Sequence, residues 1–355
     1  RLHYPAFQKL SDLFEIVAVA DPNEERLGEW AGRLNLDQSA TYASWEEMLR
    51  RDDLDAIDIM VPIPDNFTVT ETVAQRLSEK GKVNRRDRGI ICEKPLAPTM
   101  AQARAARDLA EKYHIPIMIA ENYRYSQEID LIRDLVRTAR VGRIVYFLQN
   151  RVLDFPNDMV GNTFSAREWR QHPDFPGGAF ADSALHDLAA LRHIFGAIRQ
   201  VHAFGRSQEE DFCPYSVIIA NLLFASGLPG QFAFYSAGRE MQRPLVGLRI
   251  FGTEGMIYLE ERNAGVINIA RNDGTSEQIS YEPQKGFENE LLNFHKALSG
   301  EESLSVTPEM EFGDVKTVHS ILRSIREERV VSVDETTKYG PHHDERAQPE
   351  EWFIQ

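Results

Sequence analysis

The sequence predicts an α/β protein in which a domain built on a parallel sheet is followed by an α/β domain built on an open, mainly antiparallel sheet. With 355 residues, the chain is too long for one ordinary core. From residue 14 to about 120, short β-branched runs alternate with longer stretches of helical periodicity. After about residue 125, strand-like runs follow one another directly, which is typical of antiparallel sheets. We therefore divide the chain into residues 1–125, 126–334 and a polar tail, 335–355.

The first domain is predicted from apolar runs that are suited to burial on both faces of a sheet. Capping boxes at Ser44 and Thr99, each with Glu or Gln three residues later, indicate two helix starts. Apolar residues recur every four positions in residues 69–77 and 2–10, so both segments are predicted to be helices, the latter within the first twelve residues. The predicted strands are residues 14–20, 56–61, 89–92 and 115–120.

The second domain is predicted to contain one long sheet flanked by helices. Its last helix is expected to begin at Thr307 as N-cap, with Pro308 in the first turn. The other helices are predicted at 127–137, 178–195 and 287–298. The strands are predicted at 143–152, 201–204, 216–224, 231–235, 245–251, 256–259 and 266–270.

Charge and cysteine content narrow the classes of partner. The chain has 40 Lys plus Arg against 55 Asp plus Glu, a net charge of -15, so we expect no nucleic-acid partner. Cys92 and Cys213 are the only cysteines and form neither a disulfide framework nor a metal-site spacing, which favours the cytoplasm. No run approaches 18 apolar residues, so no membrane partner is expected either.

The carboxyl ends of the predicted parallel strands are where a ligand is expected to bind. Asp21 follows the first strand, where a carboxylate can accept hydrogen bonds from the ribose hydroxyls of an adenosine. The alternative is that Asp21 only belongs to a turn before a helix. Glu93, Lys94 and Pro95 end a second strand, and this buried charge pair is either a structural ion pair or part of a site.

A second candidate lies on the helix predicted at 178–195. Asp182 and His186 are four residues apart on one face and follow Gly177-Gly178, which lets the backbone turn close to a ligand. A histidine beside a carboxylate can hold and release a proton near neutral pH. A helix cap or a surface pair is the alternative. No third ligand accompanies His186 and His193, so we predict no metal.

These motifs together resemble the signature of the Gfo/Idh/MocA oxidoreductases. The resemblance extends from about residue 2 to 334, and several separate motifs occur in the family's order. The residues that carry it are Glu93-Lys94-Pro95, Trp169-Arg170, the run 177–187, Val61-Pro62, 42–49, 122–125 and 251–255.

The resemblance implies a Rossmann-like first domain and an NAD-dependent oxidation or reduction of a sugar, inositol or related polyol. By this analogy Lys94 contacts the reacting hydroxyl and the nicotinamide ribose, His186 takes the hydroxyl proton, and Asp182 steadies substrate and base. Asp21 favours NAD over NADP, because a carboxylate repels a 2'-phosphate. The open sheet implies a homo-oligomer, a dimer or tetramer. The cofactor side would be lined by Asp21, Pro62, Asn66, Glu93, Lys94, Asn122, Trp169 and Arg170.

The chain departs from the family pattern at three places. The family's first strand and its Gly-x-Gly-x-x-Gly/Ala turn would precede Arg1, so we expect a natural precursor to carry about ten more residues. Without that central strand, two buried strands would lack a ladder partner. Asn66 stands where the family often has His, and residues 82–88 form a basic run that looks inserted.

Two other functions stay open beside a dehydrogenase. One is an NAD-dependent glycoside hydrolase of the same fold, which would use the same three residues. The other is a sensor or structural subunit that binds nucleotide or sugar without turnover, which the missing Gly-rich turn favours and the complete set of Lys94, Asp182 and His186 disfavours.

Overall fold

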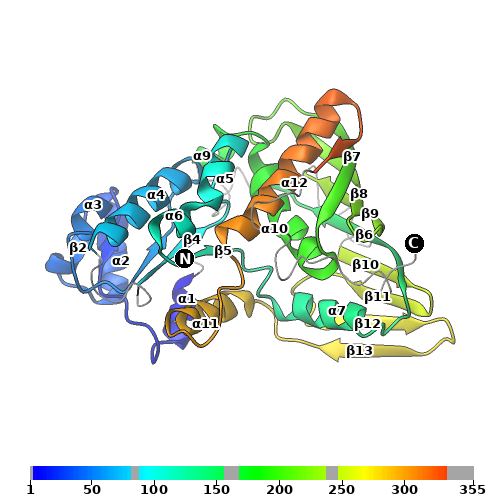
Figure 1. The fold of residues 1–355 in the computed structure, drawn as a ribbon, viewed down its shortest axis with the longest axis horizontal. Helices are drawn as coiled ribbons and strands as arrows, with labels where there is room; N and C mark the ends of the chain where they lie inside the picture. Colours follow the sequence, from blue (N-terminus) through cyan, green and yellow to red (C-terminus); the bar gives the residue numbers. More distant parts are fainter. Residues whose placement is uncertain (1–2, 81–87, 156–167, 237–246, 334–355) are drawn as a thin grey trace.

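The computed structural model describes residues 3–80, 88–155, 168–236 and 247–333. Its elements fall into two groups, one around short parallel strands and one around a long sheet, with helix α12 (Pro308–Glu327) running between them (Figure 1). The fold is the predicted class, a Rossmann-like parallel arrangement joined to a mainly antiparallel α/β part.

The parallel strands form two small sheets in place of one. Strands β3 (Ala56–Ile59), β4 (Gly89–Glu93) and β5 (Ile117–Ala120) are paired in that order, while β1 (Val19–Ala20) pairs with β2 (Thr41–Tyr42). Among the described residues, β1 and β3 have no hydrogen-bonded partner on their other edges. The strand predicted over 14–20 was therefore too long, because an extended segment without a ladder on both sides keeps few of its backbone hydrogen bonds.

Helices flank these strands where the apolar periodicity and the caps predicted them. Ser44 accepts a hydrogen bond from the backbone N–H of Glu47, and Thr99 from that of Gln102, which confirms both helix starts. The helices of this group are α1 (His3–Lys9), α2 (Glu24–Leu34), α3 (Trp45–Met48), α4 (Ile63–Lys80), α5 (Met100–Arg107) and α6 (Leu109–Tyr113), with a short 3-10 turn at Gln38–Ala40.

The second group is built on one nine-stranded sheet in the order β13-β12-β11-β10-β6-β9-β8-β7-β14. All neighbours are antiparallel except β6 and β9, which run parallel. The strands are β6 (Ile144–Val152), β7 (Ile198–Ser207), β8 (Tyr215–Phe224), β9 (Pro229–Tyr235), β10 (Gly247–Gly252), β11 (Gly255–Leu259), β12 (Val266–Arg271), β13 (Ser276–Ser280) and β14 (Val331–Ser332).

Helix α10 (Gly178–Phe195) is the central helix of this group and has the predicted bounds. It starts after Gly177, whose positive φ of 88° suits glycine, and it packs against α7 (Gln127–Arg137) and α12. Nearly all of its residues are buried, so its position relative to both groups of strands is fixed. Thr307 caps α12 as predicted, by accepting a hydrogen bond from the backbone N–H of Met310. The remaining helices are α9 (Glu168–Gln171) and α11 (Gly286–Leu298).

Three short or polar strands, β2, β13 and β14, were not predicted. Strand β13 at the sheet edge has a single apolar residue, Ile279, among four polar ones, so it lacks the apolar signal on which the prediction relied. Most of the basic run 82–88 and the tail 335–355 lie outside the described residues. Within the described part of the chain, no helix has the length and apolar character needed to cross a bilayer.

Candidate active site

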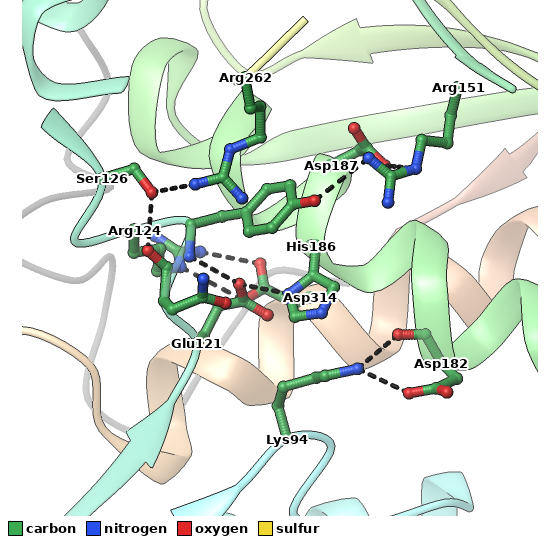
Figure 2. A network of polar contacts seen from close by, with 12 residues as sticks. Lys94, Glu121, Arg124, Ser126, Arg151, Asp182, His186, Asp187, Arg262 and Asp314 are labelled. Carbon is green, nitrogen blue, oxygen red and sulfur yellow. Dashed lines mark hydrogen bonds and ion pairs between the residues drawn. The ribbon is translucent and has the colours of Figure 1, made fainter. Parts of the chain in front are cut away.

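The site forms where the ends of β4 and β5 meet the first turns of α10. Glu93 and Lys94 are at the end of β4, Glu121 directly follows β5, and α10 contributes Asp182 and His186 (Figure 2). Parallel strands place their carboxyl ends at one edge of a sheet, which explains why residues distant in sequence meet here.

Lys94 and Asp182 form a direct ion pair. The Lys94 ammonium donates to Asp182 Oδ1 and to the Asp182 backbone carbonyl, both at 2.6 Å. Arg170 Nε donates to the other carboxylate oxygen at 2.8 Å. Burial alone would raise the pKa of Asp182, but the charges of Lys94 and Arg170 outweigh burial and hold that pKa well below its usual value. Asp182 is therefore ionised and pairs with a different cation through each carboxylate oxygen.

His186 is held by a different carboxylate. Its Nδ1 lies 2.7 Å from Glu121 Oε1, and its ring stacks on Tyr123 with centroids 4.5 Å apart at 16°. Burial opposes ionisation of Glu121, but His186 and Lys94 outweigh it and lower the pKa of Glu121. Figure 2 shows the imidazole between Glu121 on one side and Lys94 on the other.

Two arginines enclose Tyr123 from the side of the long sheet. The Arg262 guanidinium lies 3.3 Å from the centre of the Tyr123 ring, and Arg151 Nη1 donates to the Tyr123 hydroxyl at 3.1 Å. Arg262 also pairs with Glu128 at 2.7 Å, and Arg151 lies 3.7 Å from Asp187. This packing fixes the stacked ring and with it the plane of the imidazole.

The turn that carries Lys94 is held from two sides. The Asn66 amide donates to the carbonyls of Glu93 and Pro95 at 3.1 and 2.7 Å, and the Leu96 backbone N–H donates to Glu311 Oε1 at 2.9 Å. Both side chains are almost completely buried. Asn66, expected by analogy to line the cofactor side, therefore holds the backbone beside Lys94.

Glu93 is paired with a histidine from the first helix and not with Lys94. His3 Nε2 lies 3.2 Å from Glu93 Oε1, and His3 Nδ1 lies 2.8 Å from Asp58 Oδ2. Burial would raise the pKa of Glu93, but the hydrogen bond and charge of His3 lower it overall. Glu93 and Lys94 therefore do not form an ion pair with each other: Glu93 pairs with His3, and Lys94 pairs with Asp182.

The remaining predicted residues surround this centre. Asp21 accepts from the N–H of Asn23 at 2.8 Å and binds Arg26 through both carboxylate oxygens at 3.0 Å, so it does belong to a turn before a helix. Pro62 is exposed just before α4, and Asn122 is buried directly after Glu121. The Arg170 guanidinium lies 4.0 Å from the centre of the Trp169 ring.

Sequence reasoning brought Lys94, Asp182, His186 and Arg170 to one place but missed Glu121. The sequence predicts that Asp182 supports the imidazole. In the structure Asp182 instead pairs with Lys94 and Arg170, and His186 is hydrogen-bonded to Glu121. A usable signal existed, because Glu121 follows a buried strand in the same way as Asp21 and Glu93. No group of His, Cys, Asp and Glu in the described residues has a geometry that could hold a metal ion.

Polar residues gather at the carboxyl edge of a parallel sheet, and an ammonium lies beside an imidazole there, an arrangement suited to a nicotinamide-dependent oxidoreductase. The chain belongs to the GFO/IDH/MocA family: residues 1–121 match the model described as oxidoreductase family, NAD-binding Rossmann fold, and residues 129–258 match the GFO/IDH/MocA C-terminal domain.

Relatives extend over most of the chain. An uncharacterized protein of Saccharomyces cerevisiae is 25% identical, over 91% of each chain. The 1,5-anhydro-D-fructose reductase of Ensifer adhaerens is 25% identical over 83% of this chain and 84% of its own. A levoglucosan dehydrogenase solved with NADH has the same fold, with a TM-score of 0.80, 20% identity and coverage of 94% of this chain and 96% of its own.

Proposed function

We propose that this oxidoreductase transfers a hydride between NAD and a hydroxyl-bearing carbon of a sugar, inositol or related polyol. The observation that carries the proposal is the meeting of Lys94 and His186, from the two sheet-based parts of the chain, beside one buried carboxylate, Glu121. Named relatives support the substrate class, since they include a 1,5-anhydro-D-fructose reductase and a D-apiose dehydrogenase.

Each of the three residues has its own role in the oxidation of an alcohol. His186 takes the hydroxyl proton, while the Lys94 ammonium donates a hydrogen bond to the same oxygen and stabilises the negative charge that develops there. Asp182 pairs with both Lys94 and Arg170 and orients the ammonium through its 2.6 Å contacts. In the reverse direction, His186 returns the proton to the carbonyl oxygen.

The donor set fits a nicotinamide dinucleotide. Asp21 at the end of β1 offers a carboxylate for the two ribose hydroxyls at the adenosine end, while Lys94 and Asn122 stand at the ends of β4 and β5 for the nicotinamide end. When bound, the nicotinamide ring accepts or donates the hydride. Both Asp21 oxygens bind Arg26 at 3.0 Å but keep lone pairs that can accept from the ribose hydroxyls, and we propose NAD in preference to NADP on this ground. Pro62, Glu93, Trp169 and Arg170 are proposed to complete the cofactor side, and Asn66 to support it from behind.

We further propose three properties of the whole protein. The boundaries near residues 125 and 334 separate a cofactor domain from a substrate domain. The outer face of the long sheet, where Tyr146 and Phe204 are exposed by 39% and 64%, joins copies into a dimer or tetramer. Cys92 and Cys213 are free and buried, which supports a cytoplasmic location.

A direct test is to incubate the full chain with NAD and a panel of sugars, sugar acids and inositols and to follow NADH absorbance. Turnover is expected with at least one polyol, and the variants Lys94→Ala and His186→Ala are expected to lose it. Equal turnover in all three proteins contradicts the proposal.

Two further measurements distinguish a glycoside hydrolase and a binding subunit from the dehydrogenase. Release of sugar from an aryl glycoside without net NADH would favour the hydrolase. Heat of NAD binding in calorimetry without turnover of any substrate would favour the binding subunit. The intact pairing of Lys94 with Asp182 and of His186 with Glu121 supports the dehydrogenase over a protein that only binds.

A further inference from the structure

We propose that Glu121 is a positioning residue for the base: it fixes which nitrogen of His186 carries the resting proton and stabilises the imidazolium that forms during oxidation. Glu121 acts through His186 and is not proposed to touch substrate or cofactor. The inference rests on the proposed function of His186 as the base.

The geometry joins Glu121 and His186 into one unit. Glu121 is the first residue after β5 and its side chain has no solvent exposure. Its Oε1 lies 2.7 Å from His186 Nδ1 and accepts the Tyr123 backbone N–H at 3.1 Å. The Tyr123 ring then stacks on the imidazole, so one short segment controls both the hydrogen bond and the plane of the ring.

The hydrogen bond determines the tautomer. An ionised carboxylate can only accept, so Nδ1 must carry the hydrogen. Nε2 then has a free lone pair, and Figure 2 shows His186 presenting its other edge toward Lys94. During oxidation the substrate O–H bond breaks and its proton forms an Nε2–H bond on His186. A bound nicotinamide would supply the acceptor for the hydride that leaves the carbon.

The negative charge of Glu121 points to more than orientation. A backbone carbonyl or an amide could hold the same tautomer, whereas a fully buried carboxylate has a substantial desolvation cost. That cost is offset when the imidazole becomes cationic, because the ion pair forms in the transition state and strengthens the base. A buried carboxylate in this position is therefore suited to proton transfer.

Other charged groups also face this pair and contribute to its titration. Lys94 favours ionised Glu121, while the carboxyls of neighbouring elements interact unfavourably with it. These carboxyls are Asp187 on α10, Glu290 on α11 and Glu311 on α12. The effect of Glu121 must therefore be measured by changing Glu121 alone.

The test compares wild type with Glu121→Gln, which keeps the shape and removes the charge. We expect kcat to fall roughly 10- to 1000-fold, with little change in KM, because the amide can donate to Nδ1 and leave the proton on Nε2. The acidic limb of the pH profile of kcat/KM should move to lower pH, since the carboxylate 2.7 Å from Nδ1 no longer stabilises the imidazolium. Asp130→Asn is the matched control, because Asp130 pairs with His193 at 2.8 Å, further along α10, and should leave both quantities unchanged.

A measurement without substrate separates this inference from the proposed function. In 15N spectra of histidine-labelled protein, with the His186 signals assigned by His186→Asn, the wild type should show hydrogen on Nδ1, and Glu121→Gln should change the balance between the two tautomers. Hydrogen on Nε2 in the wild type, or an unchanged pH profile in an active Glu121→Gln enzyme, overturns the role of Glu121. A wild type that shows the Nδ1 tautomer but oxidises no polyol contradicts the proposed function instead.

Discussion

At the scale of single residues, the site depends on buried charged side chains that pair with side chains of opposite charge. Asp182 lies between Lys94 and Arg170, and Glu121 is hydrogen-bonded to His186. Each ion is costly to bury alone, but each has a partner within hydrogen-bond distance. The site therefore holds one ammonium and one imidazole in fixed positions before any substrate arrives, which reduces the reorganisation needed during the reaction.

The variant Lys94→Met should lower kcat/KM by roughly 100- to 1000-fold, the loss typical of removing one preorganised donor from a reacting oxygen. The physical reason is that the ammonium is lost while the aliphatic volume is kept. Steady-state kinetics with the best substrate of the panel measures this effect. Lys112→Met is a suitable control, since Lys112 pairs with Glu71 on the surface and is 54% exposed. Similar kinetics for the two variants would exclude the assigned role of Lys94.

At the scale of elements, the turn after β4 transmits the packing of two helices to Lys94. Asn66 on α4 and Glu311 on α12 both bond to its backbone. Burial raises the pKa of Glu311 to about 8, so this side chain is protonated near neutral pH and still accepts from the Leu96 N–H. The turn is thus held by two neutral groups, and no charge is added next to the ammonium.

The variant Glu311→Gln should leave activity at pH 7 nearly unchanged, because glutamine resembles the protonated acid. The pKa of Glu311 is 4.5 in the unfolded chain and about 8 in the folded protein. Its protonated form therefore stabilises the folded state, and this contribution is lost as the pH rises from 4.5 to about 8. The variant should therefore be more stable than wild type at pH 9, by about 1 kcal/mol or more. Urea unfolding at pH 5 and pH 9 measures the difference, and a wild type that is equal or superior at pH 9 would contradict it.

The helices and strands could be predicted where an apolar periodicity and residues that mark their ends were both present. Helix α10 was predicted with correct bounds because glycines stand at both its ends, Gly177 and Gly196. The strand over 14–20 was overestimated, since its composition says nothing about which neighbours complete its ladder. For the site, strand ends and helical spacing predicted two separate candidates, and the family resemblance implied that Lys94 and His186 meet, but neither could assign the partners. Asp182 and His186 share a helix face, yet Asp182 bonds to Lys94, which follows β4, and His186 bonds to Glu121, which follows β5.

At the scale of the whole molecule, buried ions also join segments that lie far apart in sequence. Asp314 on α12 binds both Arg124, just after β5, and Arg192 on α10, and all three side chains are excluded from solvent. His3 on α1 plays the same part near the amino terminus, where Asp58, Glu93 and Glu290 surround it. The first helix is thereby tied to β3, β4 and α11.

The His3 contacts predict that stability depends on pH. Burial lowers the pKa of His3, but Asp58 and Glu93 outweigh burial and raise it well above 6.5. A raised histidine pKa gives stability that is fully present below pH 6.5 and is lost as pH rises through the folded-state value. His3→Gln should therefore cost roughly 3 kcal/mol at pH 6 and less at pH 9. Chemical unfolding at both pH values tests this, and an equal cost at both would show that the His3 charge contributes nothing.

The central claim is that Lys94, Asp182 and His186 serve one hydride transfer between a hydroxyl-bearing carbon and NAD. It is tested most directly with a polyol carrying deuterium on the reacting carbon, by mass spectrometry of the nicotinamide product. We predict that wild type transfers the deuterium to the nicotinamide ring and that His186→Asn does so far more slowly. Deuterium that remains on the carbon, or is released to water while the polyol is consumed, would contradict the account.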